Sequence, residues 1–242
     1  MIHVKMTKNY TGFKIIGNYD DFYELYDNMM IALGDECLNE NIENARLHAL
    51  GFLYDLRHAY QGEREVIIAN SDLSEEIKRY HGIKENVDHE VLYAFNYVIP
   101  EALADILIFK YFLYENRKEV VIDEFDQCYN SIRLFQSKLI DALEEMLTAN
   151  QMKKVKMELY DSTMLMKDFI FQWFDLISVE YINSSKKNRK IIFMDVLDRI
   201  CNFFKYHEFK SLKDELEQYA IENDVPIGDI EGVCEYPDEI KW

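Results

Sequence analysis

One short segment of the sequence gathers several side chains that could do acid–base chemistry. It runs from Tyr54 to Arg64 and reads YDLRHAYQGER. On a helix, Asp55 and His58 share one face, with His48 on the same side two turns earlier, and a carboxylate at that spacing can orient an imidazole. Asp55 and His58 are therefore the candidate catalytic pair. The candidate ligand-binding residues are Arg57, Tyr60 and Arg64, because an arginine can hold an anionic group.

The same segment also allows a purely structural interpretation. With 6 histidines and 45 acidic residues in the chain, about one acid–histidine pair at this spacing is expected by chance. A buried ion-pair network that ties a helix to a sheet would use the same residue types. The sequence therefore leaves both a pocket and a structural network open.

The usual signatures of nucleotide, metal and hydrolase sites are absent from the sequence. Neither G-x-G-x-x-G nor G-x-x-x-x-G-K-[ST] occurs, and these glycines are what lets a backbone close on phosphates. The motifs G-x-S-x-G and H-E-x-x-H and the paired Cys/His spacing of zinc sites are missing as well. We therefore expect no cofactor and no metal, and the sequence favours a non-enzymatic role without excluding an enzyme.

The negative charge of the chain is concentrated in two segments. The net charge is −18, and residues 15–45 hold eight acidic residues and no lysine or arginine, while residues 214–242 hold ten acidic residues and one lysine. Such a field repels nucleic acid and attracts basic partners, although acidic faces also simply keep a protein in solution. We expect a basic protein partner and no nucleic acid. The candidate partner-binding residues are Asp20, Asp21, Glu24, Asp27, Asp35, Glu36, Glu231 and Glu235.

The N-terminal part of the chain alternates predicted strands with predicted helices. Strands are expected at 3–7, 13–16, 65–69 and 89–99, because these runs are rich in β-branched and aromatic residues and end at turn residues. Apolar residues at helical spacing predict helices over 19–33 and 41–60 and a short one over 74–80.

Residues 101–223 are predicted to be helical throughout. Apolar residues from Phe125 to Met146 step by three and four, and the same spacing continues from Leu159 through Met166 to Leu176. Two helices with matching spacing and a short connection are expected to pack as an antiparallel pair. The acidic tail 224–242 contains enough apolar residues to be expected to dock on the body.

These elements define an α+β fold that is predominantly helical. A small N-terminal antiparallel sheet of about four strands, packed with two helices in residues 1–99, precedes a C-terminal helical bundle in residues 100–242. The two parts are expected to form one continuous structural unit. The sequence shows no signal peptide or membrane span, and its four separated cysteines suit a reducing compartment. We therefore expect a cytoplasmic protein without membrane contact.

Three runs of residues carry a resemblance to a known family. They are GFLYDLRHAYQGEREV at 51–66, IRLFQS at 132–137 and YPDEIKW at 236–242. They resemble an uncharacterised family of hypothetical proteins from low-GC Gram-positive bacteria. The resemblance implies a bacterial cytosolic setting, and it brings no activity, cofactor or site residue with it.

Three functional hypotheses follow from the sequence. The first is a non-enzymatic protein-binding module, immunity-like or regulatory, whose acidic faces engage a basic partner. The second is a small-ligand binder or enzyme with a pocket near Asp55, Arg57, His58 and Arg64. The third is a homo-oligomer that buries aromatic and methionine-rich helix faces between subunits.

Overall fold

The structure is a computed structural model of the chain. It describes residues 1–35, 40–70, 73–84, 89–119, 122–162, 169–230 and 234–242. Two of the predicted partner-binding residues, Glu36 and Glu231, lie outside the described residues.

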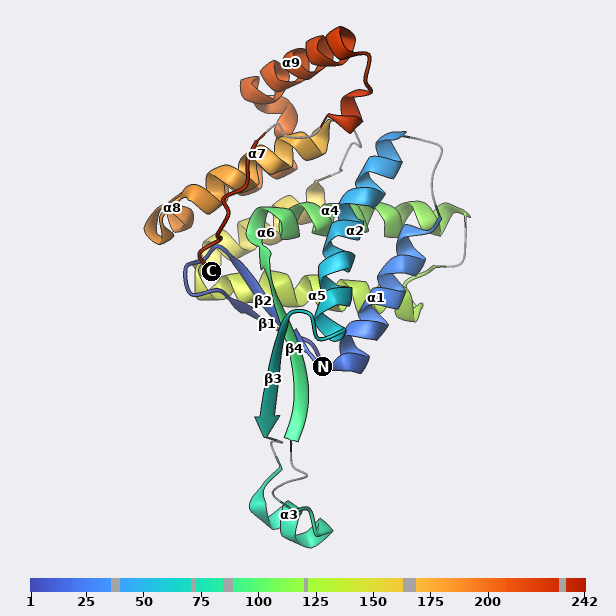
Figure 1. Cartoon of the computed structure of the whole chain (residues 1–242), viewed down its shortest axis with the longest axis vertical. Helices are drawn as coiled ribbons and strands as arrows, with labels where there is room; N and C mark the ends of the chain where they lie inside the picture. The colour runs from blue at the N-terminus through green and yellow to red at the C-terminus, as the bar shows by residue number, and fades with distance from the viewer. Residues whose placement is uncertain (36–39, 71–72, 85–88, 120–121, 163–168, 231–233) are drawn as a thin grey trace.

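The strands form one antiparallel sheet, as the sequence predicts. β1 (His3–Met6), β2 (Gly12–Gly17), β4 (His89–Val98) and β3 (Glu65–Asn70) lie in the order β1-β2-β4-β3. Thr7 closes the hairpin between β1 and β2, because its hydroxyl accepts a hydrogen bond from the Gly12 amide at 3.0 Å. β3 and β4 extend away from the rest of the molecule (Figure 1).

Two long helices cover the inner end of the sheet. α1 (Tyr19–Leu33) begins at Asn18, which forms a capping box with Asp21, and ends at Gly34, whose φ of 65° suits glycine. α2 (Glu40–Tyr60) packs beside α1 and against β4. The short helix α3 (Glu75–His81) joins β3 to β4 at the far end of these strands and has no buried residue (Figure 1).

α4 (Ile99–Glu119) is the central helix of the molecule. It follows β4 without a loop, and Pro100 fits its first turn because the amide that proline lacks would have no helical partner there. Every residue from Ile99 to Phe109 is buried, since α4 packs against α1, α2, α5, α7 and α8. Acidic residues on this helix must therefore find partners inside the protein.

The remaining helices surround α4. They are α5 (Gln127–Ala142), α6 (Ala149–Asp161), α7 (Ile170–Asn183), α8 (Lys186–Cys201) and α9 (His207–Asn223). One hydrophobic cluster runs from Phe13 and Phe22 near the N-terminus to Trp173 and Leu216. Within the described part of the chain, no helix is long and apolar enough to cross a membrane.

Two details of the helical prediction were wrong. Helix α5 begins after the N-cap Asp126, so Phe125 lies outside it and is exposed. The helix predicted to run through Ser162 to Leu176 is two helices. Ser162 has an extended backbone conformation, with ψ of 126°, which ends α6. Met166, which was part of the predicted pattern, lies outside the described residues.

The predicted antiparallel pairing of the helices before and after residue 148 was also wrong. α5 packs mainly against α1 and β1, and α6 packs mainly against α8. The periodic spacing identified the apolar stripe of α5 from Cys128 to Ala142 correctly, but a stripe does not specify which neighbour covers it.

The C-terminal segment returns to the N-terminal hairpin. Asn9 donates a side-chain hydrogen bond to the Trp242 carbonyl at 2.9 Å, and the Thr11 hydroxyl donates to the Lys241 carbonyl. A side chain at Gly12 would place its Cβ 2.7 Å from the Trp242 ring and 2.1 Å from the Tyr97 carbonyl oxygen. Glycine at position 12 therefore allows the close approach of the two chain segments.

Candidate functional site

The predicted catalytic pair is not paired in the structure. Asp55 Oδ1 accepts a hydrogen bond from Arg64 Nη2 at 2.7 Å, and His58 Nδ1 contacts Glu63. Arg57 lies over the Tyr54 ring, 5.7 Å from its centroid. The last turn of α2 therefore engages these side chains in ion pairs and ring contacts with their neighbours.

These ion pairs surround the turn between α2 and β3. The turn contains Gly62 at φ of 83°, and Gln61 to Glu65 are all exposed. Exposed ion pairs contribute only about 0–1 kcal/mol each. Asp55, His58 and Arg64 therefore stabilise the turn through contacts with their neighbours. Their side chains do not converge on a common binding site.

The predicted acidic residues of α1 form an exposed ridge. Asp20, Glu24 and Asp27 are exposed along the outer side of the helix. Asp21 has a structural role instead, since it caps the helix and lies 2.6 Å from the Met1 amino group. Asp35 and Glu235 are exposed as well, but they lie outside α1, so the structure does not bring all the predicted acidic residues together.

Tyrosines flank this ridge on the side towards α2. The Tyr19 and Tyr23 rings are stacked with centroids 5.9 Å apart, and both pack edge-on against Tyr60. Both are about half exposed. The predicted ligand-binding residue Tyr60 is thus part of this cluster. We call the surface formed by Tyr19, Asp20, Tyr23, Glu24 and Asp27 the tyrosine–acid face.

An open hollow lies on the other side of the ridge, between α1 and α5. Its volume is about 280 Å³, and Glu24 and Asp21 stand at its edge while Leu134 and Phe135 form part of its wall. Helical geometry explains the arrangement, because residues 19 and 23 lie on one flank of α1 and residues 21 and 24 are turned towards the other. The ridge therefore has an aromatic border and a recessed border.

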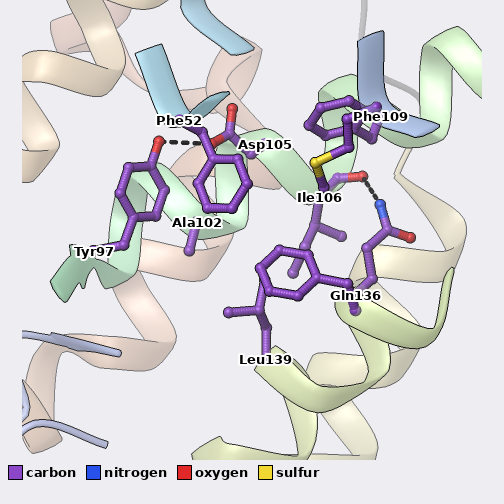
Figure 2. Close-up of a pocket in the computed structure, with 10 residues that line it drawn as sticks. Phe52, Tyr97, Ala102, Asp105, Ile106, Phe109, Gln136 and Leu139 are labelled. Atoms are coloured by element: carbon purple, nitrogen blue, oxygen red, sulfur yellow. Dashed lines mark hydrogen bonds between the residues drawn. The ribbon is translucent and has the colours of Figure 1, made fainter. Parts of the chain in front are cut away.

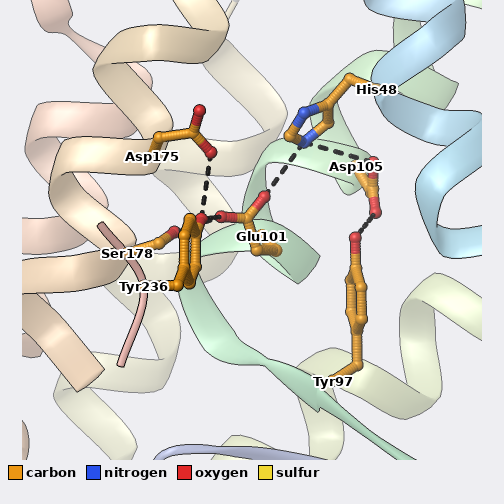
Figure 3. A network of polar contacts seen from close by, with 7 residues as sticks. All are labelled: His48, Tyr97, Glu101, Asp105, Asp175, Ser178 and Tyr236. Carbon is orange, nitrogen blue, oxygen red and sulfur yellow. Dashed lines mark hydrogen bonds and ion pairs between the residues drawn. The ribbon is translucent and has the colours of Figure 1, made fainter. Parts of the chain in front are cut away.

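A second cluster of polar groups lies in the core, where five parts of the chain meet (Figure 3). α4 supplies two carboxylates on one face, α2 an imidazole, α7 a carboxylate and a hydroxyl, and β4 and the C-terminal segment one phenol each. We call this set the buried network. Its members are His48, Tyr97, Glu101, Asp105, Asp175, Ser178 and Tyr236.

The imidazole of His48 lies between the two carboxylates of α4. Its Nε2 is 3.2 Å from Glu101 Oε2 and 3.9 Å from Asp105 Oδ1. Tyr97 donates a hydrogen bond of 2.6 Å to the other oxygen of Asp105. The side chains of His48, Glu101 and Asp105 are 14%, 12% and 7% exposed, so solvent hardly screens their charges.

Tyr236, which is 42% exposed, closes the network from the C-terminal segment at its solvent side. Its hydroxyl lies 2.9 Å from Glu101 Oε1 and 3.0 Å from Asp175 Oδ1, and the Ser178 hydroxyl donates to the same Glu101 oxygen. A phenol has one proton and can donate to only one carboxylate. Both contacts are hydrogen bonds when Asp175 is protonated and donates to Tyr236, which in turn donates to Glu101.

The electrostatics of the network agree with this proton count. Burial and the charge of Glu101 raise the pKa of Asp175. Burial would raise the pKa of Glu101 too, but its contacts with His48, Ser178 and Tyr236 lower it below the ordinary value. Of these two carboxyl groups, Asp175 is therefore the one whose surroundings favour the protonated form, and Glu101 the one whose surroundings favour the ionised form.

His48 and Asp105 are shifted in the same direction. Burial opposes protonation of His48, but the contact with Glu101 and the charges of Asp105 and Asp175 raise its pKa to about 9. Burial raises the pKa of Asp105 to about 7, against the opposing effects of His48 and Tyr97. At neutral pH the network therefore contains a protonated imidazole and a carboxyl group close to its midpoint.

The space beside Asp105 is small (Figure 2). A cavity of about 10 Å³ lies between Asp105, Phe52 and the residues of α5, which is close to the volume that one water molecule needs. Asp105 Oδ1 has no hydrogen-bond donor among the described residues. The network can hold and share protons, but this cavity is too small for a substrate.

The sequence contains a signal for the network that motif searches do not detect. Glu101 and Asp105 are charged residues four positions apart in the most apolar stretch of the chain, and Asp175 lies in another apolar helix. Charged groups in a buried helix require partners. His48 shows no such local signal, because its acidic partners are more than fifty residues away.

The comparison with protein families gives a whole-chain match. Residues 2–242 match the family described as a domain of unknown function, DUF6904. The chain belongs to the DUF6904 family. The match agrees with the resemblance to an uncharacterised family. Neither a curated protein nor a solved structure matches the chain.

Proposed function

We propose that this DUF6904 protein is a non-enzymatic protein-binding module that engages a basic partner through the tyrosine–acid face of α1. The observation that supports the proposal is the placement of exposed tyrosines directly beside an exposed acidic ridge. Tyrosine is enriched among the residues that dominate binding energy, because it buries a large area with little loss of side-chain freedom. An acidic ridge alone would not suggest a contact area.

Charge supports the choice of a basic partner. Residues 15–45 contain no lysine or arginine, so no positive side chain in this segment neutralises the ridge. A complementary charge on a partner would speed encounter and fix its orientation. The hollow beside Glu24 offers room for a side chain of that partner next to the ridge.

A non-enzymatic role is proposed because the groups that could do acid–base chemistry are engaged with one another. Asp55 and His58 are in surface ion pairs, and His48 with Glu101 and Asp105 is enclosed in the core. A reducing cytoplasmic setting in a low-GC Gram-positive bacterium belongs to the same proposal. It suits Cys128, Cys201 and Cys234, which are free thiols.

The proposal is tested by neutralising the ridge. Proteins captured from host lysate on the immobilised chain at low salt would be identified, purified and titrated by calorimetry against D20N/E24Q/D27N. We expect the captured partner to be basic and its affinity to fall roughly tenfold, as the loss of several exposed charge contacts implies. Raising the ionic strength should weaken the wild-type complex in the same direction.

A matched control separates the site from the overall charge. The variant D214N/E215Q/E222Q on α9 removes the same number of charges from another exposed acidic surface. It should leave the affinity within about twofold, because surface contacts outside the interface contribute little. Equal weakening by both variants, or an affinity that does not depend on salt, would contradict the proposal.

A further inference from the structure

The C-terminal segment is held to the body by few contacts. We define it as residues 234–242, which form neither helix nor strand and contain no buried residue. The segment ends beside the hairpin of β1 and β2 (Figure 1), where Asn9 and Thr11 donate hydrogen bonds to its backbone carbonyls. Tyr236 provides the side-chain hydrogen bonds that fasten the segment to the core.

The Tyr236 hydroxyl lies between carboxyl groups of two different helices. It is 2.9 Å from Glu101 Oε1 on α4 and 3.0 Å from Asp175 Oδ1 on α7 (Figure 3). Burial and the charges of both carboxylates raise the pKa of Tyr236, so the phenol keeps its proton. That one proton serves only one of the two contacts. The other contact is a hydrogen bond only when a carboxyl group supplies a second proton.

Asp175 is the carboxyl group better suited to supply this proton. Glu101 has partners that favour its ionised form, because the Ser178 hydroxyl donates to Oε1 and the His48 imidazole lies 3.2 Å from Oε2. Asp175 is hydrogen-bonded to Tyr236, and burial and the charge of Glu101 raise its pKa. Protonated Asp175 donates to the phenol, whereas ionised Asp175 places a negatively charged oxygen against the phenol oxygen without a proton between them.

Other ionisable groups face this contact from four parts of the chain. They are His48 on α2, Asp105 on α4, Tyr97 on β4 and Cys234 in the segment itself. The charge of His48 lowers the pKa of Asp175, but burial and the charge of Glu101 outweigh it. Asp105 and Tyr97 are hydrogen-bonded to each other on the other side of His48. Burial and the two nearby carboxylates raise the pKa of the Cys234 thiol, which therefore stays neutral.

The charge of the segment acts in the same direction as the lost hydrogen bond. It carries Glu235, Asp238 and Glu239 against Lys241, a net charge of −2. Ionisation of Asp175 adds a negative charge beneath this negative segment. The repulsion is the smaller effect, because solvent screens exposed charges, but both effects favour release.

We propose that the C-terminal segment is a proton-dependent strap, fastened over the buried network when Asp175 is protonated and loosened when Asp175 is ionised. Loosening opens Glu101 and His48 to water, because Tyr236 covers them on the solvent side. Fastening and proton binding favour each other, since the surroundings that raise the pKa of Asp175 exist only under the fastened strap. The proton's contribution is complete below the ordinary value of 3.8 and is lost as the pH rises through the raised one.

The two tryptophans of the chain can report on the strap and on the core separately. Trp242 belongs to the strap and lies against Gly12, whereas Trp173 is 1% exposed and donates a hydrogen bond to the Arg199 carbonyl. Fluorinated tryptophan incorporated into the full chain gives one fluorine NMR signal for each, and Trp242→Phe assigns them. The shift of each signal between light and heavy water measures the exposure of that ring to solvent.

The test is the exposure of the two rings as a function of pH. As the pH rises from about 4.5 to 9, Trp242 should become more exposed, and the ratio of loosened to fastened chains should rise by up to about tenfold per pH unit, as linkage to one proton requires. Trp173 should stay shielded throughout, which distinguishes loosening of the strap from unfolding of the protein.

Three variants connect the effect to Asp175. In Asp175→Asn the amide can donate to Tyr236 at every pH, so Trp242 should stay shielded across the range. Asp195→Asn removes the same charge from an exposed position on the neighbouring α8 and should behave as wild type does. Tyr236→Phe lacks the hydroxyl and should leave Trp242 more exposed at every pH.

The proposal is overturned if the exposure of Trp242 in the wild-type protein does not change with pH. An equal change in wild type and Asp175→Asn would overturn it as well, because the proton would then lie elsewhere. The wild-type titration and Tyr236→Phe decide the matter even if Asp175→Asn fails to fold. None of these changes touches the tyrosine–acid face, so the result is independent of partner binding there.

Discussion

Two helices of this protein carry acidic residues in opposite surroundings. On α1, Asp20, Glu24 and Asp27 are exposed, although Glu24 accepts a hydrogen bond from Gln127 of α5. On α4, Glu101 and Asp105 are enclosed by α2, α7 and β4. The first group keeps its charge at little cost and is available to other molecules. Glu101 and Asp105 on α4 both lie close to the imidazole of His48 and belong to a network that holds protons. The same residue type therefore serves a surface in one helix and the stability of the core in the other.

The comparison shows that the residues around an acidic side chain predict whether it is exposed or buried better than the number of charges does. The α1 acidic residues belong to a segment of net charge −8, whereas those of α4 interrupt a long apolar run. An exposed charge is hydrated and contributes little to folding, but an enclosed charge must be compensated by neighbours.

The largest expected effect is the loss of the imidazole from the buried network. His48→Ala leaves the α4 carboxylates without their cation, so the free energy of unfolding should fall by about 3–5 kcal/mol. Asp20→Asn, which removes one exposed charge from α1, should stay within about 0.5 kcal/mol of wild type. Urea unfolding followed by circular dichroism measures both. Comparable losses in the two variants would remove the distinction between the helices.

The pH dependence of stability sharpens the same comparison. Asp105 and His48 bind protons more tightly in the folded protein, with pKa values raised from 3.8 to about 7 and from 6.5 to about 9. Their contribution is complete below the ordinary values and is lost as the pH rises through the raised ones. Stability should therefore fall between about pH 4 and 9, by up to about 1.4 kcal/mol per pH unit for each proton.

Acid should destabilise the protein for a different reason. The pKa of Glu101 is lowered below its ordinary value of 4.5, so the contribution of Glu101 to stability is lost as the pH falls below that value.

Asp105→Asn removes one of the two groups whose pKa is raised, and it should flatten the dependence of stability on pH between about pH 4 and 7. Urea midpoints across this range would show it, and an unchanged slope would mean that Asp105 does not retain its proton.

A smaller effect is expected from the phenol that joins the C-terminal segment to the network. Tyr236→Phe removes a hydrogen bond from Glu101 and Asp175 and should cost about 1–3 kcal/mol. Tyr219→Phe on α9 is the control, because Tyr219 is exposed and its hydroxyl makes no hydrogen bond with any of the described residues. Thermal unfolding at one pH compares the two variants, and equal melting temperatures would assign no role to the Tyr236 hydroxyl.

The local elements could be predicted because their signals are local. Asn18 and Gly34 mark the two ends of α1, and Pro100 marks the junction of β4 and α4. The partners of α5 and α6 could not be predicted, because an apolar stripe is satisfied by any complementary surface. The prediction of one helix through Ser162 failed for a related reason, since regular spacing can continue across a break.

The candidate sites show the same limit. Asp55 and His58 were close in sequence and suggested a pair, yet Arg64 and Glu63 are their partners. The buried network unites residues as distant as His48 and Tyr236. Only the burial of Glu101 and Asp105 in an apolar run was detectable in advance. The exposed position of Asp20, Glu24 and Asp27 followed from helical spacing alone.

The contact between the hairpin and the C-terminal segment has a consequence for folding kinetics. The hydrogen bond from Asn9 to the Trp242 carbonyl joins residues 233 positions apart. Closing so large a loop is entropically costly until the intervening helices are in place. The segment that carries Tyr236 should therefore join the fold late, and its release should be an early step of unfolding that opens His48 to water before the core itself separates.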